Sequence, residues 1–139
     1  MDRLHNLTTL FKTLSDESRL RIINLLVNMK ELCVCDIERT LGFTQTKVSR
    51  HLTYLKKAGL VRDRRVGTWI LYSLAVTERP EHKELLTTLN DVLKLYPALQ
   101  EDITQLQLHI KNGQCTTLHT IYPSVSLSTQ LKKVSFKNS

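Results

Sequence analysis

The feature that most constrains the fold is a pair of short helical segments separated by a tight turn. Residues 36–41 form the first candidate helix, and Gly42 is the residue type expected just past its C-terminus. A second helix is predicted over residues 44–58, with Thr44 as its N-cap. Its apolar stripe consists of Val48, Leu52 and Leu55. Two helices joined by so short a turn are typical of a helix-turn-helix.

A β-hairpin is expected directly after this helix pair. Residues 60–64 and 68–74 are rich in β-prone side chains, and Arg65-Val66-Gly67 between them supplies turn chemistry. The arginines would lie near the tip of this hairpin. A hairpin that follows a helix-turn-helix is a wing, so the pattern predicts a winged helix-turn-helix.

The net charge of +7 is concentrated in the same part of the chain. Residues 44–72 carry seven lysines and arginines against a single acidic residue, Asp63. A focused basic patch is the expected footprint of a polyanion, and here it coincides with the predicted reading elements. We therefore expect double-stranded DNA as the partner. The predicted DNA-binding residues are Gln45, Thr46, Lys47, Ser49, Arg50 and His51 on the helix and Arg62, Arg64 and Arg65 on the wing.

The remaining segments complete a mainly α-helical chain with one β-hairpin. Helical apolar spacing is found over residues 3–14, in the segment after Ser15, and over residues 81–96 and 98–111. We predict a DNA-binding and dimerisation domain over 1–96, an additional helix over 97–112, and a flexible Ser/Thr/Lys-rich tail over 113–139. No apolar run is long enough to span a membrane, and the N-terminal segment is too polar for a secretory signal. A cytoplasmic protein with reduced thiols is expected.

The chain has three cysteines, and two of them precede the predicted helix-turn-helix. Cys33 and Cys35 are separated by one residue, whereas Cys115 follows the last predicted helix. Residues at i and i+2 share a face only in an extended segment, so both thiols can hold one ion only if residues 33–35 are extended or the helix start is distorted. Because thiolates are soft ligands, the cysteines are candidates for binding a soft metal or metalloid ion. The alternative interpretations are that they fill the core or form a redox pair.

The combination of segments resembles the ArsR/SmtB family of metal-responsive repressors. The resemblance covers residues 5–96 and rests on "ELCVCDI" (31–37) and "SRHL" (49–52), with "LKKAGLV" and "GTWILYSL" also fitting. It implies a homodimeric winged helix-turn-helix protein, with residues 3–14 and 81–96 at the dimer interface. It also implies binding to an operator and release when a metal or metalloid binds.

The resemblance points further to the arsenic-responsive members, with arsenite or antimonite as the inducer. Those members show a third cysteine three residues after the second, and this chain has Glu38 there. We therefore predict Cys33, Cys35 and Cys115 as the ligand set, with Cys115 from the same chain or from the dimer partner. Cadmium- and lead-sensing relatives carry further cysteines ahead of this region, and this sequence has none before Cys33. Zinc-sensing relatives carry an Asp-x-His motif on the C-terminal helix, and here Asp91 is followed by Val92 and Leu93, so that motif is missing.

Other functions remain open from the sequence. The chain lacks a Cys-x-x-C motif near a βαβ pattern, a glycine-rich phosphate loop and a Ser/His/Asp arrangement, so an enzyme is not expected. A cadmium- or lead-type sensor and a redox-responsive repressor with a disulfide, for example Cys35–Cys115, are the alternatives. A constitutive DNA-binding protein that does not use its thiols is a further one.

Overall fold

The computed structural model describes residues 3–75 and 79–117 of the chain. Its elements in chain order are α1 (Arg3–Leu14), α2 (Glu17–Asn28), β1 (Leu32–Cys33), α3 (Val34–Leu41), α4 (Gln45–Lys57), β2 (Val61–Val66), β3 (Trp69–Leu74), α5 (Pro80–Leu93) and α6 (Pro97–Lys111). The prediction of a mainly helical chain with a winged helix-turn-helix is confirmed.

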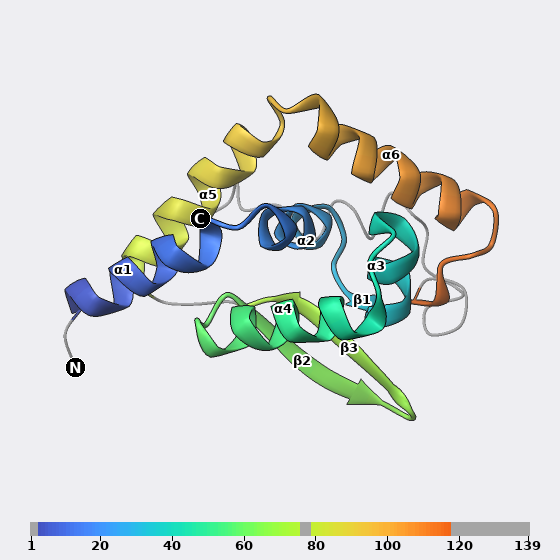
Figure 1. Ribbon diagram of the computed structural model, residues 1–139, viewed down its shortest axis with the longest axis horizontal. Helices are drawn as coiled ribbons and strands as arrows, with labels where there is room; N and C mark the ends of the chain where they lie inside the picture. Colours follow the sequence, from blue (N-terminus) through green and yellow to red (C-terminus); the bar gives the residue numbers. More distant parts are fainter. Residues whose placement is uncertain (1–2, 76–78, 118–139) are drawn as a thin grey trace.

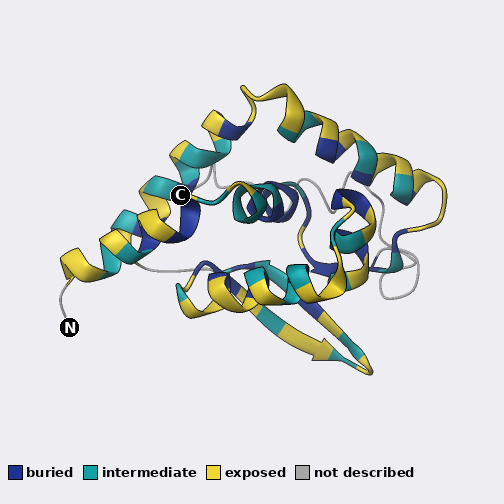
Figure 2. Ribbon diagram, viewed as in Figure 1, coloured by how far each residue is buried: buried dark blue, intermediate teal, exposed yellow. Residues whose placement is uncertain are grey.

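Helix α2 lies at the centre of the fold and is largely buried (Figures 1 and 2), and its apolar residues belong to the hydrophobic core. Helix α6 covers α2 on one side and α4 and the hairpin lie on the other, while α3 packs against both α6 and α4. Helices α1 and α5 lie side by side at one end of the molecule, where Arg3 forms an ion pair with Glu81 at 3.3 Å. The fully buried residues of α2 are Ile22, Ile23, Leu25 and Leu26.

The turn between α3 and α4 is built as the sequence predicts. Gly42 has a φ of 71°, in the left-handed region that favours glycine, and its N–H donates to the carbonyl of Glu38 at 2.8 Å. Thr44 is the N-cap of α4, and its hydroxyl accepts from the backbone N–H of Lys47 at 3.2 Å. Helix α3 begins two residues earlier than predicted, at Val34, so Cys33 occupies its N-cap position.

The sheet contains a strand that the sequence pattern did not indicate. The strand order is β1-β3-β2, and both pairings are antiparallel. Strand β1 is only two residues long, too short to show a period, but it pairs Leu32 with Tyr72 and Cys33 with Leu71. One of the predicted thiol ligands is therefore joined by the backbone to the wing as well as to α3.

The segment after α6 turns back to the start of α3. Residues 114–117 pack there, with Cys115 and Thr117 buried. The flexible tail predicted from Gly113 thus differs from the structure over these four residues, and its remainder, 118–139, lies outside the described residues. In the described ranges, no helix is both long enough and apolar enough to cross a membrane.

Candidate functional site

Helix α4 presents the predicted DNA-binding side chains on its outer surface. Val48, Leu52 and Leu55 are fully buried, which fixes the opposite face of the helix toward solvent. Gln45, Thr46 and Arg50 are exposed, and Lys47, Ser49 and His51 are partly buried. All six lie within the first two turns of α4, which is the end that contacts base edges when such a helix enters the major groove.

Two of these side chains are oriented by neighbours from outside the helix. The ammonium of Lys47 lies 3.9 Å from the centroid of the Phe43 ring, a cation–π contact. Nδ1 of His51 lies 3.5 Å from Nη1 of Arg19 on α2. Burial is the largest cause that lowers the pKa of His51 below its usual value; the Asp16 carboxylate opposes this shift and the Arg19 guanidinium adds to it.

Arg19 is a residue of this surface that the sequence reasoning missed. Its guanidinium carbon lies 4.0 Å from the centroid of the Tyr54 ring, and its Nε donates to the carbonyl of Thr13 at 2.7 Å. Arg19 thereby connects α1, α2 and α4. No local pattern indicates this role, because it depends on how α2 packs against α4.

The three wing arginines differ in their surroundings, although all are exposed. Arg64 donates two hydrogen bonds to the carboxylate of Glu31, with Nε–Oε2 at 2.6 Å and Nη2–Oε1 at 2.7 Å. Glu31 is buried and directly precedes β1, so this pair fixes the wing to the core. Nε of Arg62 donates to the hydroxyl of Ser73 at 3.4 Å. Arg65 is the arginine nearest the tip, in the register pair with Ile70.

Asp36 joins the start of α3 to the segment after α6. Its side chain is 1% exposed and accepts backbone N–H groups from Thr116 at 2.7 Å and Thr117 at 2.9 Å. The Thr117 hydroxyl donates to Asp36 Oδ2 and accepts the N–H of Cys33 at 2.9 Å. Nη1 of Arg39 lies 3.5 Å from Oδ1 and also donates to the carbonyl of Gln114. We call residues 114–117 together with Asp36 the Asp36 latch.

Two of the three predicted thiols meet at this latch. The sulfur of Cys33 donates to Asp36 Oδ2 at 3.3 Å, and that of Cys115 donates to the same oxygen at 3.5 Å. Cys33 and Cys115 are 2% and 1% exposed, whereas Cys35, in the first turn of α3, is exposed. Burial and the neighbouring Asp36 carboxylate raise the pKa of Cys33 to about 12, so this group is a neutral thiol at pH 7.

Sequence reasoning identified the three thiols but not the residues that organise them. Within residues 3–75 and 79–117, no three His, Cys, Asp or Glu side chains are gathered as a ready-made metal site. The roles of Asp36 and Thr117 were missed because their contacts join positions about 80 residues apart in the chain. The extended backbone over residues 33–35 that would turn both thiols to one face is not found, because β1 ends at Cys33 and α3 begins at Val34.

These features define a class of protein: a winged-helix DNA-binding regulator with a thiol cluster beside its helix-turn-helix. A family model for bacterial regulatory proteins of the arsR family matches residues 16–63. The arsenical resistance operon repressor of Escherichia coli (strain K12) is 50% identical over 66 residues, which are 48% of this chain and 56% of that protein. An uncharacterised HTH-type transcriptional regulator of Methanocaldococcus jannaschii is 40% identical over 72 residues, 52% of this chain and 81% of that one.

Solved structures give the same result for the fold. HlyU from Vibrio cholerae superposes with a TM-score of 0.58 at 28% identity, over 69% of this chain and 98% of that one. A second match is the homodimeric winged helix-turn-helix DNA-binding domain of a possible ArsR-family regulator from Mycobacterium bovis. It gives a TM-score of 0.56 at 31% identity, over 66% of this chain and 81% of that one. The chain belongs to the arsR family of bacterial regulatory proteins. It spans only about half the length of the E. coli repressor.

Proposed function

We propose that this chain is a metalloid-responsive transcriptional repressor. It binds operator DNA as a homodimer and dissociates when As(III) or Sb(III) binds its cysteine thiolates. The observation that carries the proposal is the meeting of Cys33 and Cys115 on one oxygen of Asp36, directly ahead of the helix-turn-helix. The E. coli relative, named as an arsenical resistance operon repressor, supports an arsenic-type inducer.

The DNA-binding half of the proposal rests on α4 and the wing. The exposed groups of α4 can read base edges, while Arg62 and Arg65 on the wing supply positive charge toward the phosphates. In a two-fold symmetric dimer, two copies of α4 would enter successive major grooves, about one helical turn of DNA apart. The homodimer of the M. bovis domain supports this arrangement.

The inducer chemistry follows from the thiols. Arsenous acid condenses with three thiols to form three As–S bonds and three water molecules, so neutral thiols such as that of Cys33 supply the protons that leave. Cys33 and Cys115 are already neighbours, and the third sulfur is that of Cys35 on the exposed side of α3. Bringing Cys35 to the buried pair requires the first turn of α3 to rearrange, because Val34 and Cys35 are helical here.

That rearrangement gives the inducer a route to the DNA-binding surface. Helix α3 packs against α4, and the backbone of Cys33 is paired with β3 of the wing. A ligand that needs the altered start of α3 binds the altered state more tightly, and only this difference in affinity can shift the equilibrium away from the DNA-binding state. Both reading elements are thus connected to a single group of thiols.

The same pair of buried thiols favours a second candidate, a redox-responsive repressor. Cys33 and Cys115 approach the same oxygen, so oxidation by a peroxide would join them in a disulfide. The two thiols would lose two electrons and two protons, and the peroxide would be reduced to water. The sequence suggested Cys35–Cys115 for this role; Cys33–Cys115 is favoured here because both of these buried thiols donate to Asp36 Oδ2, whereas Cys35 is exposed.

A titration of the reduced protein on DNA from upstream of its own gene tests the proposal. Fluorescence anisotropy should report tight binding that is lost on adding arsenite or antimonite, with cadmium, lead and zinc as comparison ions and hydrogen peroxide as the redox arm. The variants Cys33→Ser, Cys35→Ser and Cys115→Ser should each bind DNA as the wild type does but respond weakly to arsenite.

The pattern of responses separates the candidates. Release by peroxide but not by arsenite, lost in Cys33→Ser and Cys115→Ser and kept in Cys35→Ser, would favour the redox function. Release by cadmium or lead alone would favour the metal-sensing alternative. Full release by arsenite in the triple Cys→Ser variant would contradict the proposed ligand set.

A further inference from the structure

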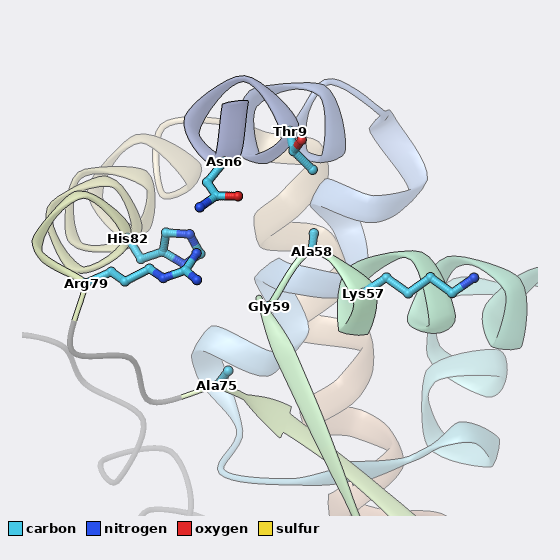
Figure 3. Close-up of a pocket in the computed structure, with 8 residues that line it drawn as sticks. All are labelled: Asn6, Thr9, Lys57, Ala58, Gly59, Ala75, Arg79 and His82. Atoms are coloured by element: carbon cyan, nitrogen blue, oxygen red, sulfur yellow. The ribbon is translucent and has the colours of Figure 1, made fainter. Parts of the chain in front are cut away.

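A cavity lies at the C-terminal end of α4, away from the Asp36 latch. It has a volume of about 350 Å³ and is lined by side chains of α1, α5 and the C-terminal end of α4, and by Ala75 just after β3 (Figure 3). Asn6 and Thr9 face it from α1, Gly59 borders it just beyond α4, and Arg79 and His82 face it from the start of α5. We call it the α1–α5 pocket.

His82 is the unusual residue of this pocket. It is 3% exposed, and among the described residues its Nδ1 has no hydrogen-bond partner. Buried side-chain nitrogens are almost always hydrogen-bonded, so an unpaired one on a residue that lines a cavity is the observation from which a bound ligand is inferred. The imidazole is directed across the pocket toward Asn6, with the guanidinium of Arg79 beside it.

The charges around the pocket favour an anion. Arg79 is the N-cap of α5 and His82 lies in the first turn of this 14-residue helix, where the helix dipole attracts negative charge. Lys57 also lines the pocket, with its ammonium pointing away from His82 and Asn6 (Figure 3), and none of the described lining residues is acidic. The carboxylate of Glu81, also in the first turn, is held by Arg3 at 3.3 Å.

The pocket is separate from the surface expected to form the dimer. Leu4 and Phe11 on α1 are 65% and 54% exposed, and their spacing of seven residues places them on one face of the helix. Asn6 and Thr9 are rotated by roughly half a turn from that face and are partly buried. A ligand in the pocket would therefore lie within one protomer, between α1, α5 and the end of α4.

We propose that the α1–α5 pocket is a binding site for a small organic oxyanion, a carboxylate or a phosphate monoester, held by His82, Arg79 and Asn6. His82 donates a hydrogen bond from Nδ1, Asn6 donates from its side-chain amide, and Arg79 contributes a charge-assisted pair of hydrogen bonds. The site goes beyond the proposed response to metalloids, because it shares no residue with the thiols. Its ligand would contact the C-terminal end of α4 and both helices of the expected dimer interface.

The test uses the full chain with inorganic phosphate and succinate as probes, against sodium chloride at matched ionic strength. Nitrogen-detected NMR of the imidazoles, with the His82 signals assigned from His82→Gln, should show a saturable shift of His82 with one or both probes. The affinity should fall at least tenfold in His82→Gln and Arg79→Gln. The matched control His5→Gln removes an exposed histidine of α1 and should bind as the wild type does.

Several outcomes would overturn this site. They are a shift that grows linearly without saturation, equal affinities in His82→Gln and His5→Gln, or a His82 response to duplex DNA in place of both probes. If His82→Gln fails to fold by circular dichroism, Asn6→Ala and Arg79→Gln decide in its place. The Cys33→Ser/Cys115→Ser variant should bind the probes unchanged, so a failure of the metalloid proposal would leave this result intact.

Discussion

At the scale of single residues, Asp36 does more for this structure than its place in a short helix indicates. It lies in the first turn of α3, where a carboxylate is favoured by the helix dipole. Its two oxygens are also the acceptors for the backbone of Thr116 and Thr117 and for two thiols. One side chain thus holds the chain after α6 against the helix that supports the reader helix.

Replacing Asp36 by Asn should release the latch. The amide nitrogen would face N–H groups that need an acceptor, so we expect a loss of about 2 kcal/mol in the free energy of unfolding. Cys115 should then become accessible, and its alkylation by iodoacetamide at pH 7, followed by peptide mass spectrometry, should speed up severalfold. In the wild type Cys35 should be labelled first, because it alone of the three cysteines is exposed.

Glu38→Gln is the matched control, since it makes the same chemical change two residues further along α3. It should leave both the stability and the order of labelling unchanged. Equal labelling rates for Cys35 and Cys115 in the wild type would mean that the latch is open in solution.

The sequence could identify the thiols but not their arrangement. Cys33 and Cys35 are close in the chain, and a family resemblance was enough to select them as ligands. Their separation into a buried and an exposed thiol depends on the helix starting at Val34, and the burial of Cys115 depends on hydrogen bonds to Asp36. Contacts of that range leave no periodic pattern in the sequence, which is why they were missed.

At the scale of the elements, the wing is anchored by one arginine and charged by another. Arg64→Gln removes the two hydrogen bonds to buried Glu31, so we expect a loss of about 1–2 kcal/mol of stability, a value reduced by the half-exposed guanidinium. Arg65→Gln should leave stability unchanged but weaken operator binding. It should also reduce the slope of the logarithm of the binding constant against the logarithm of salt concentration by about one, as expected for one lost phosphate contact. Urea unfolding and anisotropy titrations at several salt concentrations measure the two effects.

The reverse assignment would follow if Arg65→Gln destabilised the fold while Arg64→Gln changed only DNA binding. The sequence treated these two arginines alike, because both lie in a short run of charges next to a turn. Helix bounds were predicted to within a few residues, since caps and apolar stripes are local. Strand β1 could not be predicted, because it exists only through its pairing with β3.

At the scale of the whole molecule, exposed apolar side chains indicate the surface that would form the dimer. Leu4 and Phe11 on α1 are exposed, as are Leu95 and Tyr96 just after α5, and α1 and α5 lie side by side (Figure 1).

Phe11→Glu should raise the dimer dissociation constant at least tenfold and weaken operator binding, because it places a charge at an apolar contact. Lys12→Glu, a larger charge change on a neighbouring exposed position, is the control. Sedimentation equilibrium measures the difference, and equal effects of the two variants would place the dimer contact elsewhere.

The stability of the whole fold should decrease as the pH falls below 6.5. Burial is the largest cause that lowers the pKa of His82 from 6.5, with Arg79 acting in the same direction and Glu81 opposing it, and burial also lowers the pKa of His51. The unfolded chain therefore takes up protons at a higher pH than the folded chain, and the free energy of unfolding must rise with pH over that interval. Urea unfolding between pH 8 and 5.5, in a buffer free of phosphate and carboxylates, should show a decrease that begins near pH 6.5. His82→Gln should flatten part of this slope and His5→Gln should not, whereas an identical slope in both variants would show that His82 is not held neutral by the fold.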